Sequence, residues 1–201
     1  MDDLNKDKIM KIYTKALTGS TEPDYSYYEK PFDTSENKVT CSIGFAHFYG
    51  NEGKTLLNLI RKRMPVGFEK IDKDGYVSYR LDTDWEGDRW SPNPIQIEVM
   101  KKLLVSKAGI RSQKKLFRER VDSTEYNLHR NPMILQTSMT KKSTIFYIVI
   151  SLLDGDDFAK TVFNRCGYNY SLDNIYKNAK LLGKEYEKRY LEIYNSLLDS
   201  K

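Results

Sequence analysis

Residues 143–153 read Ser-Thr-Ile-Phe-Tyr-Ile-Val-Ile-Ser-Leu-Leu, the most apolar run of the chain. From Ile145 onward, apolar side chains cover every face of a helix, which is typical of a helix buried on all sides. The run is much shorter than the roughly 20 residues that a membrane-spanning helix needs. It therefore predicts a central buried helix, with Ser143 as its N-cap, and no membrane span.

Helical periodicity continues on both sides of this run. Apolar residues recur at helical spacing over residues 4–17, and Gly19 is a natural terminator for that helix. The pair Ser91-Pro92 indicates the start of a helix that extends to about residue 105. The same pattern predicts further helices over residues 55–63, 112–121, 156–165 and 174–198.

Strand-forming residues gather in two places. Residues 33–49 predict a hairpin with Asn37-Lys38 near its turn, and residues 65–90 predict a second one around Lys73-Asp74-Gly75. The expected fold class is α+β: mostly helical, with a small N-terminal β-hairpin lobe and a central buried helix. No linker rich in Gly, Ser or Pro interrupts the chain, so residues 1–201 are expected to form a single domain. Its hairpin lobe would cover about residues 30–90 and its helical lobe about residues 91–201.

Composition restricts the class of protein further. Hydrophobic residues make up 39% of the chain and aromatic residues 12%, which excludes a fully disordered protein. The net charge of +5 suits an anionic partner such as a bacterial wall polymer or nucleic acid. Cys41 and Cys166 match no zinc or redox spacing and are expected to be reduced core thiols. The N-terminal residues lack the apolar run of a secretory signal, so we expect synthesis in the cytoplasm without a signal peptide.

Several kinds of chemistry have no motif in the sequence. There is no phosphate-binding glycine loop, no nucleophile elbow and no His/Cys metal cluster, so we expect no cofactor and no metal site. His47 stands alone on a predicted strand and is interpreted as structural. Carboxylates, in contrast, cluster between the first helix and the first hairpin, mixed with aromatic residues: Glu22, Asp24, Glu29, Asp33 and Glu36, with Tyr25, Tyr27, Tyr28 and Phe32. Glycosidic cleavage uses such carboxylates, and aromatic faces can stack on sugar rings.

One short run resembles a known family. Residues 42–47, Ser-Ile-Gly-Phe-Ala-His, resemble the Thr-Ile-Gly-x-Gly-His strand of phage-type lysozymes. The wider stretch resembles the related chitosanases: Glu22, a tyrosine-rich segment, a polar turn, Thr40, and the pair Gly44-Phe45 follow in the family's order. The resemblance covers roughly residues 4–60. Ser42 stands where phage lysozymes have Thr, and Ala46 replaces a glycine.

The resemblance implies a lysozyme-like fold and a glycoside hydrolase that cleaves bacterial cell-wall peptidoglycan. Glu22 would be the general acid, its pKa raised by partial burial among tyrosines. Glu36, or Asp33, would act as base or cation stabiliser, and Thr40 or Ser42 would position water. Hairpin geometry leaves Glu29 open as the acid. Tyr25, Tyr27, Tyr28 and Phe48 are the expected sugar-binding aromatics.

Two other interpretations stay open. A structural or adaptor protein of a phage or secretion particle would keep the fold without the acid pair. A nucleic-acid-binding domain would use a basic series with few interleaved aromatics, which favours a solvated face over such an interface: Lys101, Lys102, Lys107, Arg111, Lys114, Lys115, Arg118 and Arg120. For the enzyme, the site of action would be the cell wall, reached after release or as part of a phage-like particle.

Overall fold

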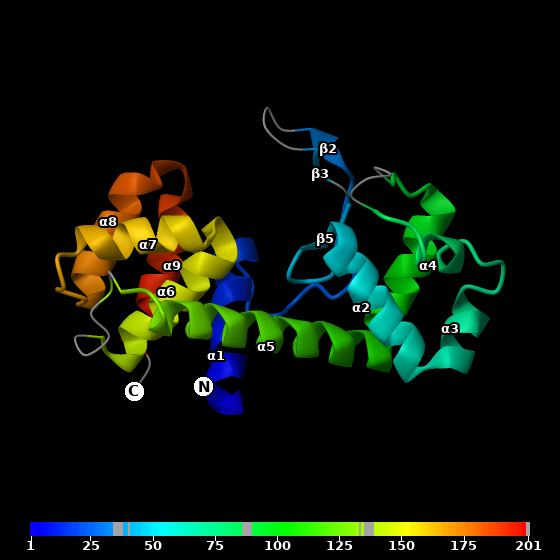
Figure 1. Ribbon diagram of the computed structural model, residues 1–201, viewed down its shortest axis with the longest axis horizontal. Coiled ribbons are helices and arrows are strands. Elements are labelled where there is room, and N and C mark those ends of the chain that lie inside the picture. The colour runs from blue at the N-terminus through cyan, green and yellow to red at the C-terminus, as the bar shows by residue number, and fades with distance from the viewer. Residues whose placement is uncertain (34–37, 40, 86–89, 133, 135–138, 200–201) are drawn as a thin grey trace. The chain divides into compact units, whose positions relative to one another are not determined.

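The computed structural model describes residues 1–33, 38–39, 41–85, 90–132, 134 and 139–199 (Figure 1). Its helices are α1 (Asp3–Thr18), α2 (Gly50–Arg63), α3 (Pro65–Ile71), α4 (Pro94–Val105), α5 (Lys107–His129), α6 (Lys141–Asp154), α7 (Asp156–Arg165), α8 (Leu172–Leu182) and α9 (Glu187–Leu198), with 3-10 turns η1 (Ser78–Arg80) and η3 (Lys184–Tyr186). Its strands are β1 (Tyr28–Glu29), β2 (Phe32–Asp33), β3 (Lys38–Val39), β4 (Ser42–Ile43) and β5 (Phe48–Tyr49). The predicted class, α+β and mostly helical, is confirmed. Among these described residues, no helix combines the length and apolar character needed to cross a membrane.

The chain divides into two compact units. Unit 1 consists of Met1–Pro23 and Arg118–Lys201, and unit 2 of Asp24–Phe117. The boundaries fall after Pro23 and inside α5, whereas the sequence predicted a lobe boundary near residue 90. The difference arises because α4 packs against α2 and α3, and α2 in turn contacts β4 and β5. Helix α4 therefore belongs to the same unit as these strands.

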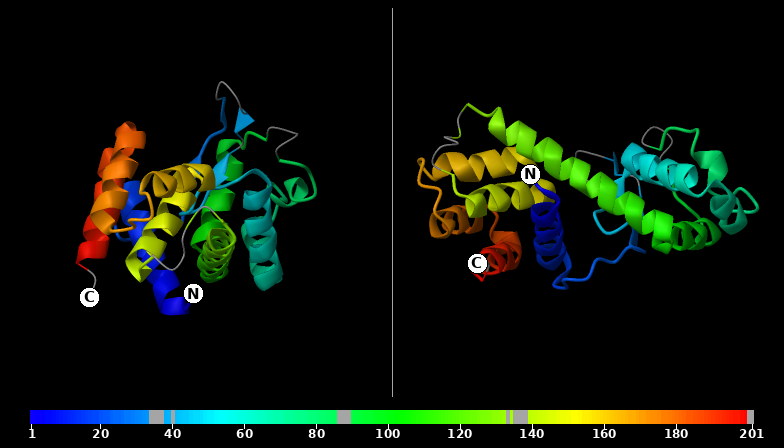
Figure 2. Two further views of the ribbon diagram at one scale, coloured as in Figure 1. Left: turned by 60° about the vertical axis from the view of Figure 1, so that its left-hand side comes forward. Right: turned by 90° about the horizontal axis from the view of Figure 1, so that it is seen from below.

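Helix α6 is the core of unit 1. Its residues 145–150 are all fully buried, and the helix contacts α1, α7, α8 and α9. Helices α1 and α9, from opposite ends of the sequence, pack side by side in the same unit (Figures 1 and 2). The predicted central buried helix is therefore confirmed.

The N-cap of α6 is Thr140, not Ser143 as predicted. The Thr140 hydroxyl accepts a hydrogen bond from the Ser143 backbone N–H at 3.1 Å, and the Ser143 hydroxyl accepts one from the Thr140 N–H at 2.6 Å. This reciprocal pair satisfies two N–H groups at the helix start. Ser143 is thus the third residue of the helix, which begins nearly one turn earlier than expected.

The predicted single helix over residues 174–198 is wrong, because the chain breaks at Gly183. A Cβ at Gly183 would lie 2.4 Å from the Tyr190 hydroxyl oxygen, so a side chain would collide with a fully buried ring. The close approach of backbone and ring requires glycine, which disfavours a continuing helix. Helix α8 therefore ends at Leu182 and α9 starts at Glu187.

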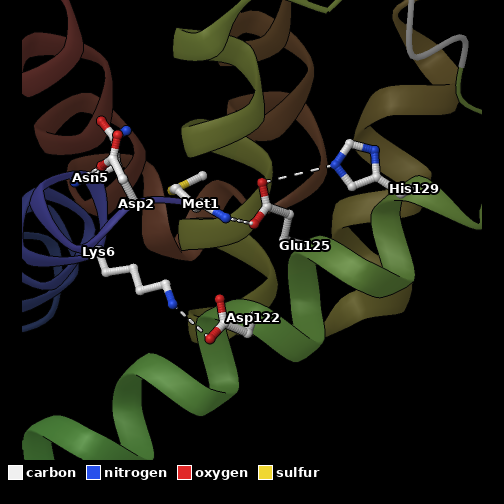
Figure 3. A network of polar contacts seen from close by, with 7 residues as sticks. All are labelled: Met1, Asp2, Asn5, Lys6, Asp122, Glu125 and His129. Carbon is white, nitrogen blue, oxygen red and sulfur yellow. Dashed lines mark hydrogen bonds and ion pairs between the residues drawn. The ribbon is translucent and has the colours of Figure 1, made fainter.

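Polar contacts hold the first residues of the chain against α5 within unit 1 (Figure 3). The Met1 ammonium lies 2.8 Å from a carboxylate oxygen of Glu125, and Lys6 Nζ lies 2.7 Å from Asp122 Oδ2. Asp2 caps α1 by accepting a hydrogen bond from the Asn5 N–H at 2.8 Å. These contacts fix the start of α1 to the part of α5 that belongs to unit 1.

Unit 2 contains two small antiparallel sheets. Strand β4 lies between β1 and β5, and β2 pairs separately with β3. The predicted 33–49 hairpin is in fact two hairpins. Lys38 begins β3 opposite Asp33, and Asn37 lies outside the described residues. A second turn, at residues 44–47, connects β4 to β5.

The second predicted hairpin, over residues 65–90, is wrong. Pro65 starts the helix α3, and the buried Asp72 follows its last residue. The Asp72 carboxylate accepts hydrogen bonds from the N–H groups of Val77 and Ser78 and from the Ser78 hydroxyl. These bonds close a compact loop with Gly75 at φ 71°, which replaces strand pairing.

Two helix boundaries also differ from the prediction. Asn93, rather than Ser91, caps α4, and Pro94 follows as its first residue. Helix α5 begins at Lys107 and not near residue 112. A Cβ at Gly109 would lie 2.2 Å from the Leu103 carbonyl oxygen, so glycine lets the start of α5 pack directly on the end of α4.

Both cysteines are free and buried, as predicted. Burial raises the pKa of the Cys41 thiol to about 12 and that of Cys166 to about 11, from an ordinary value of 9.0. We expect neither thiol to react with Ellman's reagent at pH 8 until urea unfolds the chain. Because both pKa values are raised on folding, stability is also expected to fall as pH rises above about 9. Rapid labelling of the native protein by Ellman's reagent at pH 8 would contradict the expectation that neither thiol reacts.

Candidate functional site

The sheet β1–β4–β5 has one apolar and one polar face. Side chains directly opposite each other on paired strands share a face. Tyr28, Ile43 and Phe48 form one such row, in which Ile43 and Phe48 are fully buried. The neighbouring row is Glu29, Ser42 and Tyr49. This row therefore places a carboxylate, a buried hydroxyl and a phenol on the face opposite to Ile43 and Phe48.

Two aromatic rings extend this polar row. The Tyr27 ring stacks on the His47 imidazole, with centroids 4.0 Å apart and planes inclined by 17°. His47 Nδ1 lies 3.9 Å from Glu29 Oε2, and the two side chains are 31% and 40% exposed. We call this set of Tyr27, Glu29, Ser42, His47 and Tyr49 the polar sheet face. It holds a half-exposed carboxylate close to an imidazole that is itself stacked on a tyrosine ring.

The turn that presents His47 depends on a buried glutamine of α5. Gln113 Oε1 accepts a hydrogen bond from the Phe45 N–H at 3.0 Å, while Gln113 Nε2 donates to the Tyr25 carbonyl at 3.2 Å. Gly44 has φ 73°, and a Cβ there would lie 2.5 Å from Gln113 Oε1. Glycine is therefore required both for the turn and for the close approach of Gln113. Gln113 is a positioning residue that the sequence gave no reason to select, since its partners lie far away along the chain.

Tyr28 lies on the core side of the same strand. Burial, and then the nearby Cys41, raise the pKa of the Tyr28 phenol to about 12. The phenol therefore stays protonated at neutral pH. Its role is to pack behind the polar sheet face, and the prediction that it binds sugar is not supported by this placement.

The other predicted aromatics differ in placement. Phe48 is fully buried, which contradicts the prediction that its ring stacks on sugar. Tyr25 is half-buried, and its ring lies edge-on to the Phe45 ring, with the two ring centroids 5.4 Å apart. Tyr27 is the predicted aromatic that lies on the polar sheet face, and Tyr49 is an exposed neighbour that the sequence analysis missed.

The predicted carboxylates are divided between the two units, and one of them lies outside the described residues. Glu22 belongs to unit 1 and is exposed, so the expected partial burial among tyrosines is wrong. Glu29 belongs to unit 2. Asp33 lies in β2, where its backbone pairs with Lys38. Glu36 and Thr40 lie outside the described residues.

Cavities also lie elsewhere in the described part of the chain, and two of them matter here. One in unit 2, of about 360 Å³, is lined by Arg63, Met64, Lys107, Ala108 and Arg111. One in unit 1, of about 580 Å³, is lined by residues that include Tyr126, Asn127, Arg130, Asn131, Asp156 and Asn164. Neither was predicted, because each combines residues from separate helices or turns.

Within the described residues, no three His, Cys, Asp or Glu side chains gather closely enough to hold a metal ion. No protein-family model, no curated protein and no solved structure matches the chain. The likeness of residues 4–60 to lysozymes and chitosanases therefore stays a prediction from the sequence.

Proposed function

We propose that the protein is a glycoside hydrolase that cleaves bacterial cell-wall peptidoglycan, with Glu29 as the general acid. The observation that carries the proposal is the half-exposed Glu29 carboxylate, held on the polar sheet face opposite Ser42 and beside His47. A glycosidase needs a carboxylic acid next to the leaving oxygen and a second group for water or the developing cation. A partly desolvated carboxylate suits the first role.

We assign the general acid to Glu29 and not to Glu22 because the surroundings of the two carboxylates differ. A general acid benefits from walls that exclude water and fix its position. Glu22 is exposed, whereas the Glu29 side chain is 40% exposed and lies close to an imidazole. The family resemblance favours Glu22, and the observed environment favours Glu29. Variants at Glu22 and at Glu29 distinguish these two assignments directly.

The remaining roles follow from the sequence and the sheet register. Asp33 or Glu36 would supply the second carboxylate, as the sequence predicts. Ser42 lies directly opposite Glu29 and is 5% exposed; in this proposal its hydroxyl would orient water next to that carboxylate. Thr40 keeps the same role as an alternative. The proposed site of action is the cell wall, reached after release from the cell or as part of a phage-like particle.

Tyr49 provides a test of glycan binding. It is 55% exposed, whereas Tyr79, 58% exposed, lies in the same unit but outside the sheet. If the polar sheet face binds sugar, Tyr49→Ala should weaken binding of a peptidoglycan tetrasaccharide about three- to tenfold, through lost stacking. Tyr79→Ala should leave affinity unchanged. The measurement is an NMR titration of amide signals, with melting temperatures to verify folding. Equal affinities for all three proteins would count against glycan binding at this face.

A further inference from the structure

The cavity of unit 2 lies where two helix ends meet. Arg63 is the last residue of α2, and Met64 follows it. Lys107 and Ala108 open α5, and Arg111 comes one turn later. These side chains enclose about 360 Å³, within the usual size range of a small-molecule site. We call this cavity the basic pocket.

The charges of the basic pocket are not compensated. Arg63, Lys107 and Arg111 are exposed, and none forms an ion pair or a side-chain hydrogen bond with any described residue. No acidic residue is among those that line the cavity. Some cations elsewhere do have partners: Lys102 lies 2.7 Å from Glu98, and Arg118 lies 2.8 Å from Asp7. Three unpaired cations around one cavity create a local positive potential that attracts an anion.

The start of α5 adds to this potential. Its first turn contains no acidic side chain. Ser106 satisfies the N–H groups of Gly109 and Ile110, each at 2.9 Å. The N–H groups of Lys107 and Ala108 have no acceptor among the described residues. Unpaired N–H groups at a helix N-terminus bind anions well.

We propose that the basic pocket binds a phosphate group carried by a small phosphomonoester, such as a sugar phosphate. Two guanidinium groups match the oxygens of a tetrahedral anion, and a lysine adds a third charge. A phosphate dianion carries two negative charges, so these three cations attract it more strongly than they attract a singly charged carboxylate. Met64 and Ala108 give the pocket an apolar wall for the carbon part of the ligand. The proposal is independent of the glycosidase activity, because its test does not measure hydrolysis.

A compact pocket favours one phosphate group over a nucleic-acid strand. A strand places charges along its whole length, and its binding spreads over many cations. The three cations here surround one cavity. Binding should therefore depend strongly on the lining residues and weakly on nearby basic residues outside the pocket.

The test is a titration of the full chain with inorganic phosphate at constant ionic strength, followed by amide NMR. We expect saturable shifts at Lys107, Ala108 and Arg111, and glucose 1-phosphate should bind at the same residues. Arg63→Gln and Arg111→Gln should each weaken binding about tenfold. Arg61→Gln is the matched control: it removes the same charge from α2 at an exposed position outside the pocket, and should leave affinity unchanged.

Other results would overturn the proposal. Shifts that grow linearly without saturation would indicate general ion screening. Equal weakening by Arg61→Gln and Arg63→Gln would indicate a diffuse basic surface. If acetate bound as tightly as phosphate, the pocket would not be specific for a phosphate group. A DNA oligonucleotide that binds far more tightly than glucose 1-phosphate, with equal losses in all three variants, would indicate a nucleic-acid surface instead. Circular dichroism verifies that each variant is folded.

Discussion

Ile148→Asp should unfold unit 1. Ile148 is fully buried in α6, and this helix contacts four others. The substitution places a carboxylate where neither water nor a cation can pair with it, at a cost of several kcal/mol. Domains are commonly stable by only about 5–15 kcal/mol, so little or no stability should remain. Circular dichroism and thermal melting measure the loss.

Two control variants separate the effect of burying a charge from the other effects of a substitution in α6. Ile148→Val removes one methylene group and should cost about 1 kcal/mol. Lys141→Asp introduces the same carboxylate at an exposed position in the first turn of α6. An acid there interacts favourably with the helix N-terminus, so melting should be unchanged or slightly raised. If Ile148→Asp melted like wild type, α6 would not be the core of its unit.

The parts of the fold that local signals determine were predicted well. The apolar run of α6 has no polar face, so it has to be buried in a chain of this length. The periodicity of residues 4–17 and the terminator Gly19 predicted α1, which ends at Thr18 with Gly19 at φ 77°. In both places every neighbouring residue favours the same structure.

Long-range contacts decided the elements that were predicted wrongly. Residues 174–198 look like one amphipathic helix, and the break at Gly183 is explained by Tyr190 packing against it. The turn around Gly75 looks like a hairpin turn, but the Asp72 carboxylate uses the N–H groups that a hairpin would pair. Neither contact can be read from local patterns.

The candidate site was predicted by residue type more than by geometry. The sequence identified the segment and included Glu29, Ser42 and Tyr27. It favoured Glu22 as the acid on the family resemblance, and the exposure of Glu22 could not be predicted because it depends on tertiary surroundings. It interpreted His47 as structural, although the imidazole lies 3.9 Å from Glu29. Gln113 acts across 68 residues of sequence, a separation over which a single sequence gives no signal.

Glu29→Gln should reduce glycan cleavage by roughly 10²–10⁴-fold, the usual contribution of general acid catalysis. The amide keeps the size of the carboxyl group and can still form hydrogen bonds, but it cannot donate the acidic proton. Because the Glu29 side chain is 40% exposed and its carboxylate lies 3.9 Å from His47 Nδ1, the melting temperature should change little. Surface pairs of this kind contribute at most about 1 kcal/mol.

Glu22→Gln is the matched control for this prediction. It makes the same chemical change seven residues earlier, at an exposed carboxylate of unit 1. We expect activity close to that of wild type. Loss of activity in Glu22→Gln, with Glu29→Gln active, would keep the reaction class and transfer the acid role to Glu22.

The most direct test of the proposed function is the release of reducing ends from purified peptidoglycan by the wild-type protein and these two variants. We predict release by wild type and Glu22→Gln at similar rates, and at least a 100-fold lower rate for Glu29→Gln, within the range expected for a general acid. If the folded wild-type protein releases no reducing ends, or if neither substitution changes the rate, the glycosidase proposal is contradicted. A non-catalytic structural or adaptor role would then replace it.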